Sequence, residues 1–226
     1  QQKADTGIAA CLKHFAGYGA VNAGREYNDV EISRRTFLEQ YVKPFRMALK
    51  AKPAMVMTAF NAIDRKPISG NKELLRDLLR DKEGFDGTVI SDWGSIGQLE
   101  EQGVAADMDE AAVQAIEAGV DIDMMSPAYM FRLEELVKNG QIPESFIDES
   151  AFRVLMMKNQ LGLFENPFAG LGKSGKLTMH NREKAYQLAG ESCVLLKNDK
   201  ILPLSMKKKV IWAGPYTTSR ELLSRW

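Results

Sequence analysis

The sequence contains few of the residues that bind metals or form disulfide scaffolds. Only two of its 226 residues are cysteine and two are histidine. Since a zinc ion in a protein takes three or four such ligands, we expect no metal site, and no cofactor is indicated. Cys11 and Cys193 lie far apart along the chain, and we interpret both as small buried hydrophobic side chains.

An excess of charge of one sign is also absent. Thirty basic residues balance thirty acidic ones, which gives no support for a nucleic acid or a membrane surface as partner. The apolar runs, such as residues 54–60, are far shorter than the roughly 20 residues needed to cross a bilayer. We therefore expect a soluble chain, and its oligomeric state is not indicated.

Three common site motifs are missing as well. The sequence has no P-loop and no GxSxG nucleophile elbow. Gly17, Gly19 and Gly24 are spaced as GxGxxxxG, which differs from the dinucleotide-binding pattern GxGxxG. These absences argue against nucleotide-binding proteins and serine hydrolases of those types.

Four short apolar segments alternate with amphipathic ones. We expect strands at residues 8–13, 54–60, 87–93 and 120–125, and helices at residues 33–51, 71–82, a stretch ending near 118, and 129–140. Ser33 and Asn71 are the expected N-caps, and Gly119 the expected helix stop. Apolar strands that alternate with helices are typical of parallel sheets built from βαβ units. The expected class is α/β: the four units would form half of a (β/α)8 TIM-type barrel, and a doubly wound open sheet fits the same pattern.

The rest of the chain divides at a connector. A helix is expected at residues 143–164, with its methionines packed in the core, and the Gly-, Pro- and Ser-rich stretch "ENPFAGLGKSGKLTM" follows. A helix at residues 180–192 and a strand at residues 207–215 would open a second domain. We therefore predict a partial barrel at 1–163, a linker at 164–180 and the truncated start of a second α/β domain at 181–226. Because the chain lacks a starting methionine and stops at "LLSRW", we expect a fragment of a longer protein.

Polar side chains gather where the expected strands end, which is where α/β barrels place their reactive groups. Asp92 is the strongest candidate because it ends an apolar run, and Trp93 beside it offers a flat face of the kind that stacks on a sugar ring. The other candidates are Lys13, His14, residues 57–61, Asp121 and Asp123.

Each candidate also has a structural interpretation. Asp92 could be the N-cap of the next helix, and Lys13 and His14 a satisfied structural pair. Asp121 and Asp123 are expected to make structural hydrogen bonds. Asp107 and Asp109 are interpreted as a solvated helix start, and His180 as a residue at the start of a helix.

Seven blocks of sequence, taken in order, resemble one enzyme family. They are KHFAGYGA, GREYNDVEIS, VMTAFN, GTVISDWG, AGVDIDMM, LGLFENPF and ESCVLLKN. Together they resemble glycoside hydrolase family three, in its β-glucosidase and β-xylosidase branch. The acetylglucosaminidase branch carries KHFPGHG and a histidine as proton donor. Here Ala16 and Tyr18 stand at the distinguishing positions, and no histidine occurs between His14 and His180.

The resemblance implies a barrel joined to an α/β sandwich, with the active site between them. This chain would hold the C-terminal half of the (β/α)8 barrel and the beginning of the α/β sandwich domain. It implies a retaining β-glycosidase that acts on a small glycoside or oligosaccharide. In the family's pattern Asp92 is the catalytic nucleophile, and Lys13 and His14 hydrogen-bond sugar hydroxyls. Trp93 forms part of the wall on the leaving-group side. A periplasmic or secreted location is suggested by the resemblance alone.

The same pattern implies two further residues of the pocket, and a catalytic glutamate that this chain does not contain. Met57 and Phe60 would line the pocket, and many relatives carry tyrosine where Phe60 stands. A retaining glycosidase needs two carboxyl groups about 5 to 5.5 Å apart, and its nucleophile must stay ionised, which a nearby lysine would favour. The family's second domain supplies the acid/base glutamate, and no glutamate here matches it. The fragment itself is therefore expected to be inactive.

Two other functions fit the same residues. One is a Schiff-base lyase or aldolase that uses Lys13, with His14 for proton transfer. The other is a sugar-binding relative that has lost catalysis. Trapping with borohydride would identify the first, and binding of a sugar without hydrolysis the second.

Overall fold

A computed structural model describes residues 8–168 and 178–219 of the chain. The chain divides into two compact units, residues 1–169 and 170–226, which are considered separately. Within the described residues, no helix combines the length and the apolar character needed to span a membrane.

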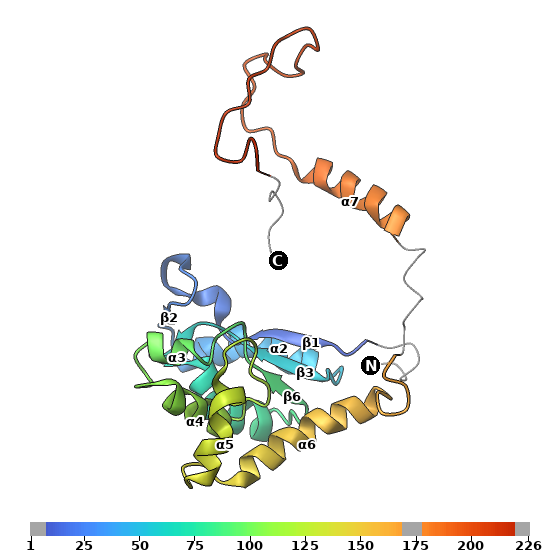
Figure 1. Ribbon diagram of the computed structural model, residues 1–226. Helices are drawn as coiled ribbons and strands as arrows, with labels where there is room; N and C mark the ends of the chain where they lie inside the picture. The colour runs from blue at the N-terminus through green and yellow to red at the C-terminus, as the bar shows by residue number, and fades with distance from the viewer. Residues whose placement is uncertain (1–7, 169–177, 220–226) are drawn as a thin grey trace. The chain divides into compact units, whose positions relative to one another are not determined.

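The first unit is built on a parallel sheet of three strands (Figure 1). β1 (Cys11–Phe15) pairs with β3 (Met55–Thr58), and β3 pairs with β6 (Thr88–Ile90). The strand order therefore follows the chain order, as in consecutive βαβ units. The predicted α/β class is confirmed, and its assignment as half of a (β/α)8 barrel stays a prediction.

The prediction of a fourth strand at residues 120–125 was wrong. The segment is reduced to a single parallel bridge between Ile90 and Ile122. The backbone N–H groups of Asp121 and Ile122 both donate to the carbonyl of Val89, at 2.8 and 3.1 Å. Since two neighbouring donors share one acceptor, the regular spacing of a ladder is lost.

The helices between these strands follow the sequence pattern. α1 (Arg34–Thr36), the π-helical segment η3 (Phe37–Val42) and α2 (Lys43–Leu49) run on from one another, and Ser33 caps the start by accepting from the N–H of Thr36 at 3.1 Å. η5 (Glu73–Lys82) follows Asn71, whose side chain accepts from the N–H of Leu74 at 3.1 Å. Both predicted caps are confirmed.

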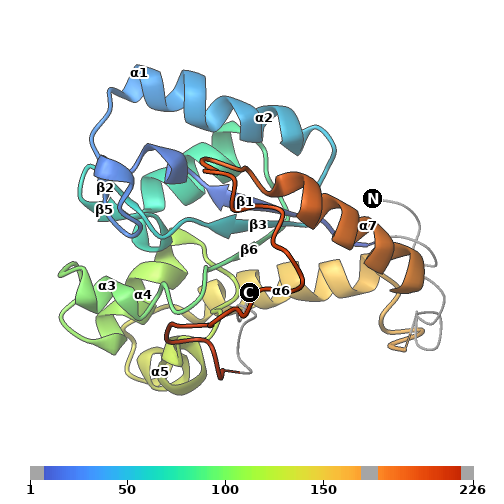
Figure 2. The same cartoon turned by 90° about the horizontal axis from the view of Figure 1, so that it is seen from above.

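The second half of the unit is helical. α3 (Gln98–Glu101) precedes α4 (Met108–Ala118), α5 (Ala128–Lys138) and α6 (Glu144–Gln160). Gly119 ends α4 as predicted, with φ at 94°, a backbone conformation that glycine tolerates best. Figure 2 shows α1 and α2 on one side of the sheet and α6 on the other. The core between them contains Val56, Leu75, Leu79, Val89 and Ile116.

A small second sheet ties together the loops that follow β1 and β3. β2 (Asp29–Val30) pairs in parallel with β4 (Ala62–Ile63), and β4 forms a hairpin with β5 (Lys66–Pro67). The short 3-10 turns η1 (Tyr18–Ala20), η2 (Asn22–Gly24) and η4 (Ile68–Gly70) complete these loops. The residues after β1 and those after β3 are thereby held next to each other.

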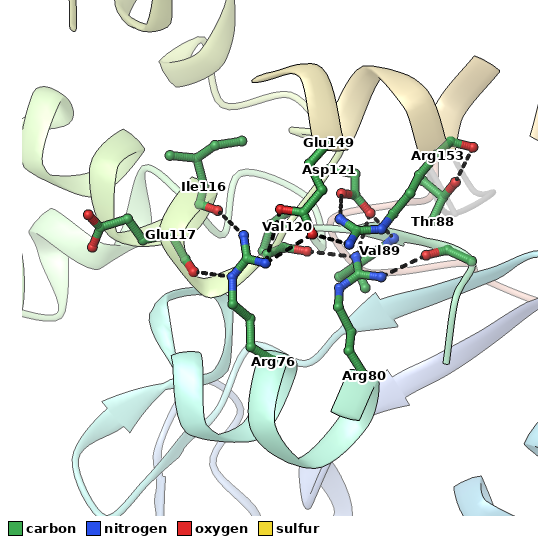
Figure 3. Close-up of polar contacts among 12 residues, drawn as sticks. Arg76, Arg80, Thr88, Val89, Ile116, Glu117, Val120, Asp121, Glu149 and Arg153 are labelled. Atoms are coloured by element: carbon green, nitrogen blue, oxygen red, sulfur yellow. Dashed lines mark hydrogen bonds and ion pairs between the residues drawn. The ribbon is translucent and has the colours of Figure 1, made fainter. Parts of the chain in front are cut away.

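A buried ion-pair cluster, defined by Arg76, Arg80, Asp121, Glu149 and Arg153, holds α6 and η5 to the sheet (Figure 3). The Asp121 carboxylate accepts from Arg80 at 2.7 Å and Arg153 at 3.0 Å. It also accepts from the backbone N–H of Val89 at 2.7 Å. Because each charge has partners of opposite sign, the cost of burying it is offset.

Two packing predictions for the first unit were wrong in part. The methionines of α6 were expected in the core, yet Met156 is exposed, as are Phe152 and Leu155 on the same helix. α6 lies against β6 and α4, and Ser150 is its buried residue. One side of α6 therefore packs, and the remaining apolar side chains face outward. Cys11 is only half-buried, with a free thiol.

The second unit contains one described helix, α7 (Thr178–Ser192), with His180 in its first turn. Residues 193–219 form neither helix nor strand, so the strand expected at 207–215 is absent. Ile211 and Trp212 are exposed there, and the described residues of this unit contain no strand with which they could pair. Cys193 is exposed rather than buried. Most of the predicted linker lies outside the described residues, and the domain boundaries stay a prediction.

Candidate active site

The parallel sheet brings two predicted site residues together at the carboxyl ends of its strands. His14 lies near the end of β1, and Asp92 follows β6 by two residues. The imidazole Nε2 of His14 is 3.3 Å from Oδ2 of Asp92. Side chains 78 residues apart in the sequence thus meet because parallel strands end at the same edge of a sheet.

Asp92 is buried, with 7% of its surface exposed, and its carboxylate is held on one side only. Oδ1 accepts from the backbone N–H of Trp93 at 2.7 Å. Oδ2 receives no hydrogen bond from any described residue, since the contact with His14 lacks hydrogen-bond geometry. A buried acceptor without a donor is costly in a folded protein, which marks Oδ2 as an oxygen kept for another partner.

The interpretation of Asp92 as a helix N-cap was wrong. The next helix, α3, begins at Gln98 and its N-cap position is Gly97. Asp92 is followed instead by a turn in which the N–H of Ser95 donates to its backbone carbonyl at 3.1 Å. The carboxylate is therefore not used to end a helix.

Three buried hydroxyl groups form a chain that begins at the backbone N–H of Asp92. Thr58 lies in the candidate range 57–61, whereas Ser69 and Ser95 were not singled out from the sequence. The backbone N–H of Asp92 lies 3.3 Å from Oγ1 of Thr58, the last residue of β3. Thr58 Oγ1 is 2.9 Å from Oγ of Ser69, which is 2.7 Å from Oγ of Ser95. All three residues are buried. Only the fold could show this chain, because its members come from three separate loops and strands.

His14 is half-buried beside Asp92 and Tyr18. Burial lowers the pKa of His14 below its usual range, and this outweighs the opposite effect of the Asp92 charge. The imidazole is therefore neutral at neutral pH, with one donor and one acceptor nitrogen. The rings of His14 and Tyr18 meet edge to face, with centroids 5.1 Å apart.

Lys13 does not share this environment, although it precedes His14. Its side chain is exposed, whereas that of His14 is half-buried. Among the described residues, no hydrogen bond links the Lys13 and His14 side chains. The structure therefore does not show them as a mutually satisfied pair.

The pocket residues expected from the MTAFN block lie on and after β3. Met57 is buried within the strand, and Phe60 is half-buried beyond its end. The Phe60 ring lies 4.7 Å from that of Tyr27 and 6.1 Å from that of Tyr18, between ring centroids. Phe60 thus belongs to an aromatic group with two tyrosines from the loop after β1.

Trp93 follows Asp92 in the chain and is 47% exposed. It lines a hollow of about 600 Å³ together with Gln98, Glu100, Glu101 and Pro127, among others. An exposed indole at the rim of a hollow of this size offers a flat apolar face.

The remaining candidates are structural. Asp121 belongs to the buried ion-pair cluster, and Asp123 accepts from the N–H of Tyr129 at 3.2 Å, in the first turn of α5. Asp107 caps α4 by accepting from the N–H of Glu110 at 2.9 Å. Asp109 pairs with Arg132 at 3.0 Å. Within residues 8–168 and 178–219, no group of three or more His, Cys, Asp or Glu side chains could hold a metal ion.

Comparison with known proteins gives a consistent set of relatives. The sequence model described as glycosyl hydrolase family 3 N terminal domain matches residues 1–157. The chain is 36% identical to a periplasmic beta-glucosidase of Salmonella typhimurium, over 97% of this chain and 30% of that protein. It is 41% identical to a putative beta-xylosidase of Formosa agariphila, over 93% of this chain and 29% of that protein.

Solved structures of the same kind resemble the fold. The beta-glucosidase of Listeria innocua in complex with glucose is 44% identical, with a TM-score of 0.76, and the match covers 88% of this chain and 28% of that one. A mutant of that enzyme in complex with laminaribiose matches with a TM-score of 0.75 at 43% identity, over 87% of this chain and 28% of that one. The chain thus spans less than a third of the length of these relatives.

Proposed function

The chain belongs to glycosyl hydrolase family 3, and we propose that it carries the nucleophile and part of the sugar-binding pocket of a retaining β-glycosidase. The proposed substrates are small β-linked glucosides, xylosides or oligosaccharides, in keeping with the names of the relatives. The relative from Salmonella typhimurium is named as periplasmic, which supports an exported location for this protein.

One observation carries the proposal. Asp92 is buried at the carboxyl end of β6, with Oδ1 held by a backbone N–H and Oδ2 without a donor among the described residues. An ionised carboxylate with one fixed and one uncommitted oxygen is suited to attack an electrophilic carbon. His14 at 3.3 Å from that oxygen marks the side from which a substrate hydroxyl could be held.

The proposed reaction has two steps. Oδ2 of Asp92 attacks the anomeric carbon, the bond to the leaving oxygen breaks, and a second carboxyl group gives that oxygen its proton. Water then attacks the same carbon, the second carboxylate takes its proton, and Asp92 is released. We propose that this second carboxyl group belongs to a longer protein of which the chain is part. The chain alone would then bind sugar without turning it over.

The surrounding residues receive proposed roles from their positions. The neutral imidazole of His14 hydrogen-bonds a sugar hydroxyl beside Oδ2, and Phe60 lines the apolar side of the pocket. Trp93, which lines the hollow described above, contacts the leaving group. Lys13 and Met57 are proposed substrate contacts on the family pattern. Because the Lys13 side chain is exposed, we propose that it contributes less to sugar binding than His14 does.

The experiment compares Asp92→Asn with Asp86→Asn in the full-length protein. Asp86 is an exposed aspartate that precedes β6, so it controls for the loss of one charge near the same strand. Hydrolysis of an aryl β-glucoside is expected to fall by a factor on the order of 10⁴ or more for Asp92→Asn and to stay unchanged for Asp86→Asn. A 2-fluoro-sugar that forms a covalent adduct elsewhere than on Asp92 would refute the assignment.

Two results would favour the other functions considered from the sequence. Binding of glucose by calorimetry without any hydrolysis would indicate a sugar-binding protein. Covalent trapping of a carbonyl substrate on Lys13 by borohydride would indicate Schiff-base chemistry.

A further inference from the structure

We propose that Tyr18 and Glu26 form a positioning pair for His14, which holds its imidazole against the uncommitted oxygen of Asp92. The inference rests on the proposed function and adds two residues to it. Neither contacts Asp92 through a hydrogen bond, so both act through His14.

The pair is linked by a hydrogen bond across the loop after β1. The Tyr18 hydroxyl donates to Oε1 of Glu26, which lies eight residues further along. A hydrogen bond to an ionised acceptor is stronger than one between neutral groups, so it fixes the rotation of the Tyr18 side chain. Burial and this bond together raise the pKa of the Tyr18 hydroxyl above its usual range, so it remains the donor.

The fixed phenol ring in turn limits the orientation of His14. The two rings meet edge to face at 5.1 Å, with an angle of 68° between their planes. An imidazole that turned about its side-chain bonds would lose this contact and would carry Nε2 away from Asp92. The order of contacts is therefore Glu26 to Tyr18, Tyr18 to His14, and His14 to Asp92.

A second aromatic contact keeps the phenol from moving outward. Phe60, from the loop after β3, lies 6.1 Å from the Tyr18 ring and 4.7 Å from the Tyr27 ring. The pairing of β2 with β4 holds these two loops side by side. Tyr18 is thus held by Glu26 at its hydroxyl and by Phe60 at its ring.

The charges that face His14 come from three parts of the chain. Asp92 follows β6, Lys13 precedes His14 on β1, and Glu26 lies in the loop after β1. Asp92 and Glu26 favour the protonated imidazole, whereas Lys13 and burial oppose it. The Tyr18 ring faces the same imidazole without a charge of its own.

The activity test uses five variants of the full-length protein and an aryl β-glucoside. Tyr18→Phe and Glu26→Ala each remove the hydrogen bond, and each is expected to lower kcat/KM by about 3- to 10-fold. The double variant should be no slower than the slower single variant. Glu26→Gln keeps an acceptor for the hydroxyl and is expected to recover most of the activity. Tyr41→Phe, at a half-buried tyrosine of η3, is the control that should change nothing.

The decisive comparison repeats Tyr18→Phe and Glu26→Ala in a His14→Ala background. If the pair acts through His14, neither change lowers the residual activity further. The same fold-loss in both backgrounds would mean that the pair merely stabilises the loop, and the inference would be overturned.

A measurement without substrate separates this inference from the proposed function. The titration of His14 is followed by NMR, with its signal assigned from the His14→Gln variant. Removing the Glu26 charge should shift the midpoint to lower pH in both Glu26→Gln and Glu26→Ala, because a nearby carboxylate favours the protonated ring. An unshifted midpoint together with unchanged kinetics would overturn the inference. An unaltered protein that hydrolyses no glycoside would instead refute the proposed function.

Discussion

Asp92 and Asp121 are buried to the same degree, at 7% and 8% exposure, and they lie toward opposite ends of β6. Asp121 has a donor on each oxygen: Arg153 on Oδ1, and Arg80 with the N–H of Val89 on Oδ2. Asp92 has a donor on Oδ1 alone. Burial therefore does not distinguish these two carboxylates, whereas the completeness of their hydrogen bonds does.

The difference has an energetic meaning. A buried charge that is paired and hydrogen-bonded is stabilised in place. Removing one partner leaves the other charge buried without compensation, which lowers the stability of the fold. A buried carboxylate with an unmet oxygen lowers stability, and such residues are typical of functional sites, where activity is gained at the expense of stability. The two ends of β6 should therefore respond in opposite ways to the same substitution.

The largest effect is expected at Asp92, the proposed nucleophile. In the full-length protein, Asp92→Asn should remove activity by about four orders of magnitude or more, yet leave the urea midpoint unchanged or raise it. The amide is neutral and is cheaper to bury than an unpaired carboxylate oxygen. The check is to measure unfolding and hydrolysis on the same preparations. A strongly lowered midpoint would show that Asp92 is a structural residue after all.

At the structural end, Asp121→Asn should give the reverse result. The change leaves the buried Arg80 without its paired carboxylate, whereas Arg153 keeps Glu149. A loss of about 3 to 5 kcal/mol in the free energy of unfolding is expected. Urea titration of the full-length protein measures it. Asp81→Asn, at an exposed position of η5, is the control and should have little effect. Loss of activity in folded Asp121→Asn protein would contradict the division of roles.

Gly87→Ala tests how tightly the chain is packed at the same end of β6. A Cβ at residue 87 would lie 2.5 Å from the carbonyl oxygen of Ala54 and 2.7 Å from Cζ of Phe85. Neither neighbour can move without disturbing the sheet, so a loss of about 1 to 3 kcal/mol is expected. Thermal unfolding provides the measurement. Gly84→Ala has open space around its Cβ but a φ of +72°, so it separates crowding from backbone strain.

The smallest expected effect concerns Glu149, at the solvent side of the ion-pair cluster. Burial alone would raise its pKa, but the hydrogen bonds and charges of Arg153 and Arg76 lower the pKa below its usual 4.5. A depressed pKa means that the carboxylate stabilises the fold above about pH 4.5 and that this contribution is lost as the pH falls through the folded-state value.

Glu149→Gln should therefore cost about 1 kcal/mol or less at neutral pH, and the difference from the unaltered protein should shrink in acid. Unfolding curves at a series of pH values provide the measurement. Asp148→Asn, at an exposed position of the same helix, is the matched control. A difference that grows in acid would contradict the ion pairs seen in Figure 3.

The sequence predicted the features that depend on local pattern. Periodicity located the three strands of the parallel sheet and the helices that follow them, and local side-chain chemistry predicted the caps at Ser33 and Asn71. Asp92 and His14 could be placed at one edge because parallel strands end there. Their contact needed no knowledge of the loops.

What the sequence could not predict depends on partners that are remote or set by loop conformation. Arg80 and Arg153 have the spacing of ordinary exposed helix residues, and only the fold brings both onto Asp121. The bond from Tyr18 to Glu26 depends on the path of an irregular loop. The prediction of a strand at residues 207–215 was wrong because an apolar run becomes a strand only when another strand is present to pair with it. No strand occurs among the described residues of the second unit.

The small sheet of β2, β4 and β5 has a practical consequence for protein engineering. The turn between β4 and β5 consists of Asp64 and Arg65, both with positive φ, and the N–H of Arg65 donates to Oδ1 of Asp29 at 3.1 Å. The loops at residues 16–32 and 59–71 are therefore joined at their tips as well as by strand pairing. A chimaera that exchanges one of them with a homologue should misfold locally, whereas a graft that transfers both as a single cassette should retain the pocket.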